Sequence, residues 1–279
     1  VKLGLIFFGK RKVLSYCLFN YFFDIFIINK FTKSQVIGTF KKKGFVKLNE
    51  NFSDEIERIG IYLNEIDRIN LGKMHYRLDL KTKSKIIDVF SDKLSSILDD
   101  LENYYNFKPA IVDAQVWSNN SFKRESKNDL ISESFHCDGY LSNYFKIHIN
   151  FKDVSEQDGP MTIVEKNYNK KFVKDFNYLD RNSYKKSSDQ SMPYIYKNVG
   201  KKGEALLFDS ANSFHCANIP QENNIRTMMQ LVLFVPPYKL KSSNQVLDLF
   251  DNYKKYTKPY NIRKMFLLFF QYLTKKNNL

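Results

Sequence analysis

The chain has 279 residues, and its 44 lysines and arginines against 30 aspartates and glutamates give a formal net charge of +14. Hydrophobic residues (43%) and aromatic residues (16%) suffice for a packed core, while 10 glycines and 7 prolines exclude a collagen-like or low-complexity chain. Three cysteines are too few for a disulfide framework, so we expect a cytoplasmic globular protein.

The two ends of the chain are apolar and basic. Within residues 1–32, the apolar run at 13–29 contains an asparagine and an aspartate, and it is shorter than the roughly 20 apolar residues of a spanning helix. Residues 238–279 are predicted to form a basic, aromatic helical extension. We expect both ends to pack on the domain, with peripheral membrane contact as the alternative, and the oligomeric state stays open.

Helical periodicity marks the first part of the middle domain, residues 33–237. A short helix followed by a strand is predicted at 33–48, with Gly44 ending the helix. A second helix is expected to begin at Ser53 as its N-cap. A longer helix is predicted over 82–104 from one apolar stripe. The stripe consists of Ile86, Phe90, Leu94, Ile97 and Leu101.

The pattern changes to strands after residue 109. The predicted strands are 110–117, 145–151, 161–164, 205–208 and 227–235. Helices followed by short strands predict an α+β chain built on a β-sandwich or barrel. The polar stretch 167–200 is too long for a turn, so we expect either a lid over a site or a partly ordered insertion.

Four residues form a pattern that carries chemistry. His136 and Asp138 are two apart, so on a strand both side chains point to one face and can bind one metal ion. His215 supplies a third ligand, and Arg226 follows it. Two imidazoles and one carboxylate are the facial ligands of non-haem Fe(II) oxygenases, with positions left open. A guanidinium suits the far carboxylate of a chelating keto acid, because it binds planar oxyanions with two hydrogen bonds.

Further segments extend this pattern over about 35–237. Residues 136–140, then 151–154 with 158–161, then 203–208 leading to His215 and Arg226, occur in one order. In these motifs the chain resembles the phytanoyl-CoA dioxygenase-like family of Fe(II)/2-oxoglutarate-dependent oxygenases. The resemblance implies an α+β fold with a double-stranded β-helix (jelly-roll, cupin-like) core at about 109–237, with the N-terminal helices packed on it.

The resemblance also implies an activity. His136, Asp138 and His215 would bind Fe(II), and Arg226 would bind 2-oxoglutarate. The expected enzyme is a dioxygenase that uses O2 to hydroxylate a small organic substrate, releasing succinate and CO2. The basic balance of the chain is compatible with an anionic substrate.

Several other side chains are candidates for the same site. Alternation along the predicted strand puts Lys146 and His148 on one face, and His148 matches a position where the family contacts the cosubstrate. The alternative is a polar face turned to solvent. We expect Lys146 to pair with a substrate anion and Gln115 to be a weaker cosubstrate contact. Thr227 or Ser213 would supply the hydroxyl that the family often has where this chain has an alanine.

Other kinds of site fit the sequence less well. Phe-His-Cys occurs twice, which suggests zinc, but adjacent strand residues face opposite sides. The carboxylate of Asp138 disfavours the halogenases of the class, which lack it. Val232 stands where nucleic-acid demethylases carry a second arginine, so no nucleic-acid partner is expected. A jelly-roll module that binds a ligand or a membrane without turnover remains the alternative function.

Overall fold

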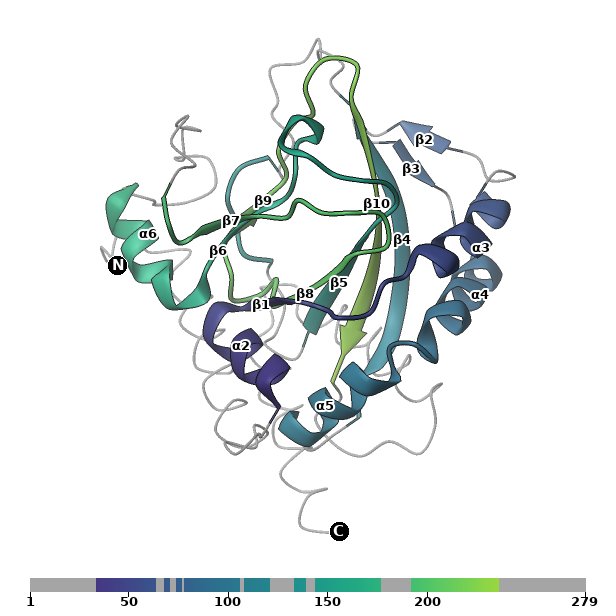
Figure 1. The fold of residues 1–279 in the computed structure, drawn as a ribbon, viewed down its shortest axis with the longest axis horizontal. Coiled ribbons are helices and arrows are strands. Elements are labelled where there is room, and N and C mark those ends of the chain that lie inside the picture. Colours follow the sequence, from purple (N-terminus) through teal and green to yellow (C-terminus); the bar gives the residue numbers. More distant parts are fainter. Residues whose placement is uncertain are drawn as a thin grey trace, which may run out of the picture.

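A seven-stranded antiparallel sheet is the largest element of the computed structural model (Figure 1). Its strands in spatial order are β1 (Phe45–Lys47), β8 (Ala205–Phe208), β5 (Tyr144–Asn150), β10 (Ile225–Phe234), β4 (Ala110–Asn120), β3 (Met74–Tyr76) and β2 (Arg68–Asn70). A second antiparallel sheet has the order β7 (Ile195–Lys197), β6 (Thr162–Val164) and β9 (His215–Cys216). The structure describes residues 34–63, 68–70, 74–76, 78–105, 108–120, 133–138, 144–176 and 192–235.

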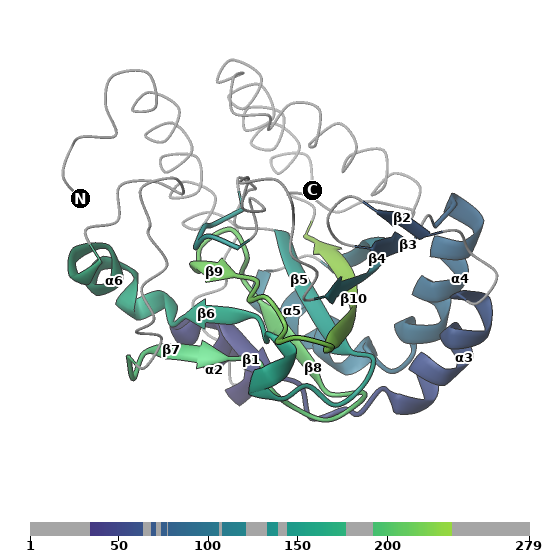
Figure 2. The same ribbon diagram turned by 90° about the horizontal axis from the view of Figure 1, so that it is seen from above.

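Helices cover one face of the large sheet. The α-helices are α2 (Gln35–Lys43), α3 (Ser53–Leu63), α4 (Leu80–Ser91), α5 (Ser95–Tyr105) and α6 (Asn169–Asp175). Short 3-10 turns lie at Glu156–Asp158 and Lys166–Tyr168. In both views α3 and α4 lie on the side of β4 that faces away from the small sheet (Figure 1, Figure 2).

The face of the large sheet toward these helices is apolar. Ile147 and Ile149 of β5 and Leu231 of β10 are fully buried in one cluster with residues of the helices. Phe52, in the segment before α3, and Phe90 of α4 belong to the same cluster, and their ring centroids lie 5.7 Å apart. Burial of such side chains contributes roughly 1.5–3 kcal/mol each, so this layer supplies most of the stability of the fold.

The opposite face of the large sheet is the inner face, because the small sheet covers part of it. Phe45 and Phe208 of the large sheet pack there against Met161 and Ile163, beside and within β6. Farther along the same face the side chains are polar, with His148 of β5 directly opposite Gln230 of β10. Polar groups are costly to bury unless they are hydrogen-bonded, so this polar interior marks the region of a functional site.

The predicted helix and strand at the start of the domain are confirmed. Ser34 caps α2 with its hydroxyl, which accepts from the N–H of Ile37. Gly44 ends the helix with a positive φ of 79° and donates its N–H to the Phe40 carbonyl, as glycine does at helix ends. β1 follows at once.

The predicted single helix over 82–104 is wrong in one respect. The structure has two helices, α4 and α5, separated by a turn at 92–94 where Ser95 donates its N–H to the carbonyl of Asp92. All five residues of the predicted stripe are nevertheless buried. Apolar spacing indicates which side of a helix faces the core. A short turn between two helices that bury the same side does not change this spacing, so the sequence pattern did not reveal the break.

The five predicted strands are present: 205–208 has its predicted ends as β8, and the other four have ends shifted by one to three residues. β2, β3, β7 and β9 were not predicted because each has only two or three residues. The predicted lid at 167–200 contributes α6 and β7 near its ends, and 177–191 lie outside the described residues. The predicted terminal segments 1–32 and 238–279 lie outside them too. Among the helices that are described, none is both long and apolar enough to cross a membrane.

Candidate metal centre

His136 and His215 are brought together by the backbone. The two residues form an antiparallel β-bridge in which each N–H donates to the carbonyl of the other, at 3.0 and 2.9 Å. Side chains of such directly opposed residues leave the same face of the pair. The two imidazole rings therefore lie side by side, with centroids 4.4 Å apart.

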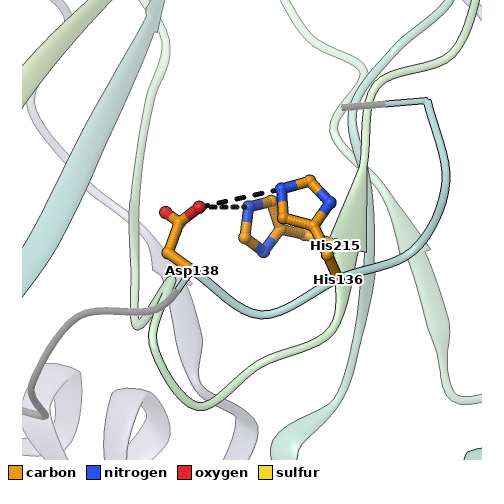
Figure 3. A group of neighbouring side chains, drawn as sticks. All are labelled: His136, Asp138 and His215. Atoms are coloured by element: carbon orange, nitrogen blue, oxygen red, sulfur yellow. Dashed lines mark ion pairs between the residues drawn. The ribbon is translucent and has the colours of Figure 1, made fainter. Parts of the chain in front are cut away.

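Asp138 completes a cluster of three side chains that could hold a metal ion (Figure 3). Its Oδ1 lies 3.7 Å from Nε2 of His136 and 3.8 Å from Nε2 of His215. All three ligand atoms lie within 4.8 Å of one another. Ligand atoms that bind one ion at its usual bond lengths are about 3–4 Å apart, so this donor set suits a divalent metal.

The tautomer of each histidine is set by a backbone carbonyl. Nδ1 of His136 is 2.8 Å from the carbonyl oxygen of Ser134, and Nδ1 of His215 is 3.0 Å from that of Ser213. A carbonyl only accepts, so Nδ1 carries the proton and donates in both cases. The lone pair of each Nε2 is thereby left toward the cluster, the arrangement usual for metal-binding histidines.

A turn after β8 supplies backbone carbonyl groups that contact two of the three clustered residues. Asp209 accepts from the backbone N–H of Asn212 and pairs with the ammonium of Lys166 at 2.8 Å. Within this turn the Ser210 carbonyl accepts the N–H of Asp138 at 2.8 Å. The turn thus positions Asp138 and, through the Ser213 carbonyl, His215.

Lys146 lies beside the acidic ligand. Its Nζ is 2.6 Å from Oδ2 of Asp138, the oxygen that does not face the imidazoles. Burial raises the pKa of Asp138, but Lys146 and the two histidines together lower it well below its usual range. The sequence predicted that Lys146 pairs with a substrate anion, whereas the structure pairs it with Asp138, a candidate metal ligand.

Arg226 is a buried cation on the inner face. It is 2% exposed, and its Nε and Nη1 atoms have no hydrogen-bond partner among the described residues. Burial lowers the pKa of Arg226 to about 10, against the opposing fields of Cys216 and Asp158, so it stays charged at neutral pH. A buried guanidinium with unused N–H donors suits the carboxylate of a ligand.

The structure places the remaining candidates in different positions. His148 and Gln115 lie on the inner face, joined through Gln230 by hydrogen bonds of 2.9 and 3.2 Å. Thr227 does not join them. It alternates with Arg226 along β10 and therefore points to the other side of the sheet, where its hydroxyl lies 2.7 Å from that of Ser118.

Three residues of the site were missed from the sequence. Asn119 pairs directly with Arg226 across the strands and is buried. Gln230 follows Arg226 by four residues, so period-two alternation from Arg226 was the signal that could have found it. Asp113 stands two residues before Gln115 on β4 and could have been found in the same way.

The cysteines next to the histidines do not join the cluster of ligand-type side chains that the described residues form. Cys216 is buried in an apolar cluster with Phe135, Val164 and Phe172. Burial raises the pKa of the Cys137 thiol well above its usual value, so the thiolate that binds zinc is disfavoured there. Two imidazoles and a carboxylate are the donor set.

No protein-family model and no curated protein matches the sequence of this chain. Among solved structures, HygX from Streptomyces hygroscopicus with nickel, 2-oxoglutarate and hygromycin B bound is similar, with 19% identity over 74% of this chain and 88% of HygX, at a TM-score of 0.50. EctD from S. alaskensis with bound Fe is 13% identical over 77% of this chain and 83% of EctD, at a TM-score of 0.52. At these identities the likeness shows the fold alone. The predicted α+β fold with a jelly-roll core is confirmed.

Proposed function

We propose that this chain is an Fe(II)- and 2-oxoglutarate-dependent dioxygenase that hydroxylates a small organic substrate and releases succinate and CO2. The observation that carries the proposal is the combination of two elements in one fold. Two imidazoles and one carboxylate lie together as candidate facial ligands, with each imidazole Nδ1 held by a backbone carbonyl, and a buried guanidinium with unused donors lies on the inner face of the large sheet.

In this proposal each side chain has a separate task. His136, Asp138 and His215 would hold the ferrous ion, and Arg226 would donate hydrogen bonds to the distal carboxylate of 2-oxoglutarate. When bound, iron and 2-oxoglutarate supply the oxidising power that dioxygen needs to hydroxylate a carbon atom. Lys146 holds one oxygen of Asp138, so the other oxygen stays directed at the imidazoles.

The surroundings of the cluster support chemistry in a dry site. The Phe208 ring lies 5.3 Å from the ring of His215 and 4.7 Å from that of His148. The Trp117 ring also packs against the His148 ring, with ring centroids 5.7 Å apart. Exclusion of water protects reactive intermediates from side reactions.

Membership of the phytanoyl-CoA dioxygenase-like branch is part of the proposal. It rests on the sequence motifs around Asp138, His215 and Arg226. The binding in HygX of hygromycin B together with 2-oxoglutarate gives the proposal a precedent for a small-molecule substrate on this fold. An anionic substrate is favoured by the net charge of +14.

The experiment is succinate release from 2-oxoglutarate by the Fe(II)-loaded protein in air, first alone and then with a panel of small carboxylates, phosphorylated sugars and acyl thioesters. We expect slow succinate formation without substrate and a faster rate with the true substrate. Asp138→Ala should abolish both. Asp153→Ala should leave both unchanged, because Asp153 is an exposed aspartate whose carboxylate pairs with the Lys201 ammonium and accepts the backbone N–H of Lys202. A folded wild-type protein that binds 2-oxoglutarate but never forms succinate would instead be a binding module.

A further inference from the structure

A chain of hydrogen bonds crosses three adjacent strands of the large sheet and ends at His148. It begins at Asp113 on β4, passes through Gln115 of the same strand to Gln230 on β10, and reaches His148 on β5. Figure 1 shows these three strands side by side. The three donor–acceptor distances are 2.8, 3.2 and 2.9 Å. Asp113, Gln230 and His148 are each less than a tenth exposed.

The direction of every hydrogen bond follows from Asp113, because a carboxylate only accepts. Its Oδ1 accepts from the ammonium of Lys83 at 2.6 Å and from the N–H of Ala114 at 3.1 Å, and its Oδ2 faces Gln115. Gln115 must therefore offer its NH2 group to Asp113 and its carbonyl to Gln230. Gln230 in turn offers its NH2 to Gln115 and its carbonyl to His148.

The last bond determines the tautomer of His148. Since the Gln230 carbonyl accepts, Nε2 of His148 carries the proton and donates to it. Burial lowers the pKa of His148 well below its usual value, with the cations of Lys146 and Arg226 acting in the same direction, so the ring is neutral. The lone pair is then on Nδ1, which is buried and has no hydrogen-bond partner among the described residues.

His148 also lies close to the proposed metal ligands. It shares the inner face with Lys146, which contacts Asp138, and one ring, that of Phe208, contacts both His148 and His215. A buried acceptor without a partner costs free energy, unless the ligand of the site supplies a donor. Ionised 2-oxoglutarate has only acceptors, so it cannot satisfy this nitrogen.

We infer that His148 is a specificity residue whose Nδ1 accepts a hydrogen bond from a hydroxyl or amine group of the substrate, and that Asp113, Gln115 and Gln230 are positioning residues that hold it as an acceptor. The substrate would then be a small molecule with a hydroxyl or N–H donor near the metal. The role of His148 in binding a substrate rests on the proposed function, whereas the tautomer of His148 rests only on the hydrogen bonds. It replaces the expectation that His148 contacts the cosubstrate.

One substitution should invert the whole relay. In Asp113→Asn the carbonyl of the new amide must stay at the Oδ1 position, where Lys83 and Ala114 donate, so its NH2 faces Gln115. Both glutamine amides must then turn over, and Gln230 donates to Nε2 of His148. The proton of His148 moves to Nδ1, which becomes a donor. Lys83→Met is the matched control, because it removes the same ion pair but keeps the carboxylate.

The test is the nitrogen NMR spectrum of metal-free protein labelled with 15N at histidine, with the His148 signals assigned by His148→Asn. We expect Nε2–H in the wild type and in Lys83→Met, and Nδ1–H in Asp113→Asn. Addition of Zn(II) with 2-oxoglutarate to the wild type should leave Nδ1 of His148 unprotonated. Protonated Nδ1 in the free wild type, or after 2-oxoglutarate binds, would overturn the inference.

The substrate class is tested on any compound that the succinate assay finds active. Replacement of its hydroxyl or amine donor by a methoxy group, which cannot donate, should raise the wild-type KM about tenfold or more, since an acceptor is left unpaired, and Asp113→Asn should lose this discrimination. Active substrates without any donor would overturn the substrate class. Absence of every activity would count against the oxygenase, while the tautomer measurement would still test the relay.

Discussion

Replacement of Arg226 by methionine should have opposite effects on the free protein and on its complex with 2-oxoglutarate. The guanidinium is 2% exposed, and two of its nitrogen atoms lack a partner among the described residues. A buried donor without a partner costs about 1–3 kcal/mol, and more when it is charged. Arg226→Met fills similar space without that cost, so the ligand-free protein should be stabilised by about 1–3 kcal/mol.

The same substitution should remove the stabilisation that 2-oxoglutarate provides. Two charge-assisted hydrogen bonds at about 1.5–3 kcal/mol each amount to a loss of affinity of about 10²- to 10⁴-fold. At a ligand concentration 100 times its Kd the wild type gains about 2.7 kcal/mol, whereas the variant should gain almost nothing. Arg226→Lys keeps the charge but not the paired geometry, so it should bind with intermediate affinity.

Thermal unfolding of the metal-loaded, oxygen-free protein with and without 2-oxoglutarate measures both effects. One kcal/mol corresponds to a shift in Tm of about 2–4 °C for a domain of this size. The reasoning predicts a higher Tm for free Arg226→Met and no further rise with 2-oxoglutarate. A lower Tm together with an undiminished response to 2-oxoglutarate would show that Arg226 is a structural residue, and would refute its proposed role.

Three further predictions concern the scaffold and His148. Ile147→Ala should lower the free energy of unfolding by about 2–5 kcal/mol in urea titrations, because Ile147 is fully buried in the main core; a loss under 1 kcal/mol would mean that this layer is loosely packed. Gly44→Ala should destabilise by about 1–3 kcal/mol, since φ is 79° and a Cβ would meet the Ser213 side chain, whereas Gly38→Ala in the open part of α2 should be neutral or stabilising; equal effects of the two would contradict the role of Gly44. Because burial lowers the pKa of folded His148 below its usual 6.5, the unfolded chain takes up the proton first, and the free energy of unfolding should fall as pH drops below about 6.5, by up to about 1.4 kcal/mol per pH unit. His148→Asn should lack this part of the slope in metal-free protein, and identical slopes would show that His148 titrates normally in the fold.

The candidate ligand triad could be predicted from the sequence because two of its members are only two residues apart. Strand alternation predicts that His136 and Asp138 share a face. No other histidine in the chain has a carboxylate two residues away with a further histidine and an arginine later in the sequence. The fold could be predicted for the same reason: the apolar spacing of α3 to α5 and the alternation along β5 and β10 each follow from which side is buried.

Contacts between distant segments could not be predicted in this way. The pairing of Lys146 with Asp138 depends on where the tertiary fold places Asp138 relative to β5, and long side chains reach partners that spacing does not identify. Thr227 was expected to supply a hydroxyl that the family often has where this chain has an alanine, but it is adjacent to Arg226 on β10, and adjacent strand residues face opposite sides. The relay from Asp113 to His148 needed the register of three strands, which only the structure supplies.

The most direct test of the account is an absorbance titration of 2-oxoglutarate into oxygen-free Fe(II)-loaded protein. The account predicts a weak visible charge-transfer band that saturates at one 2-oxoglutarate per chain, and that is absent in Asp138→Ala with the fold retained. A wild-type protein that develops no band, or an Asp138→Ala protein that develops the full band, would contradict it.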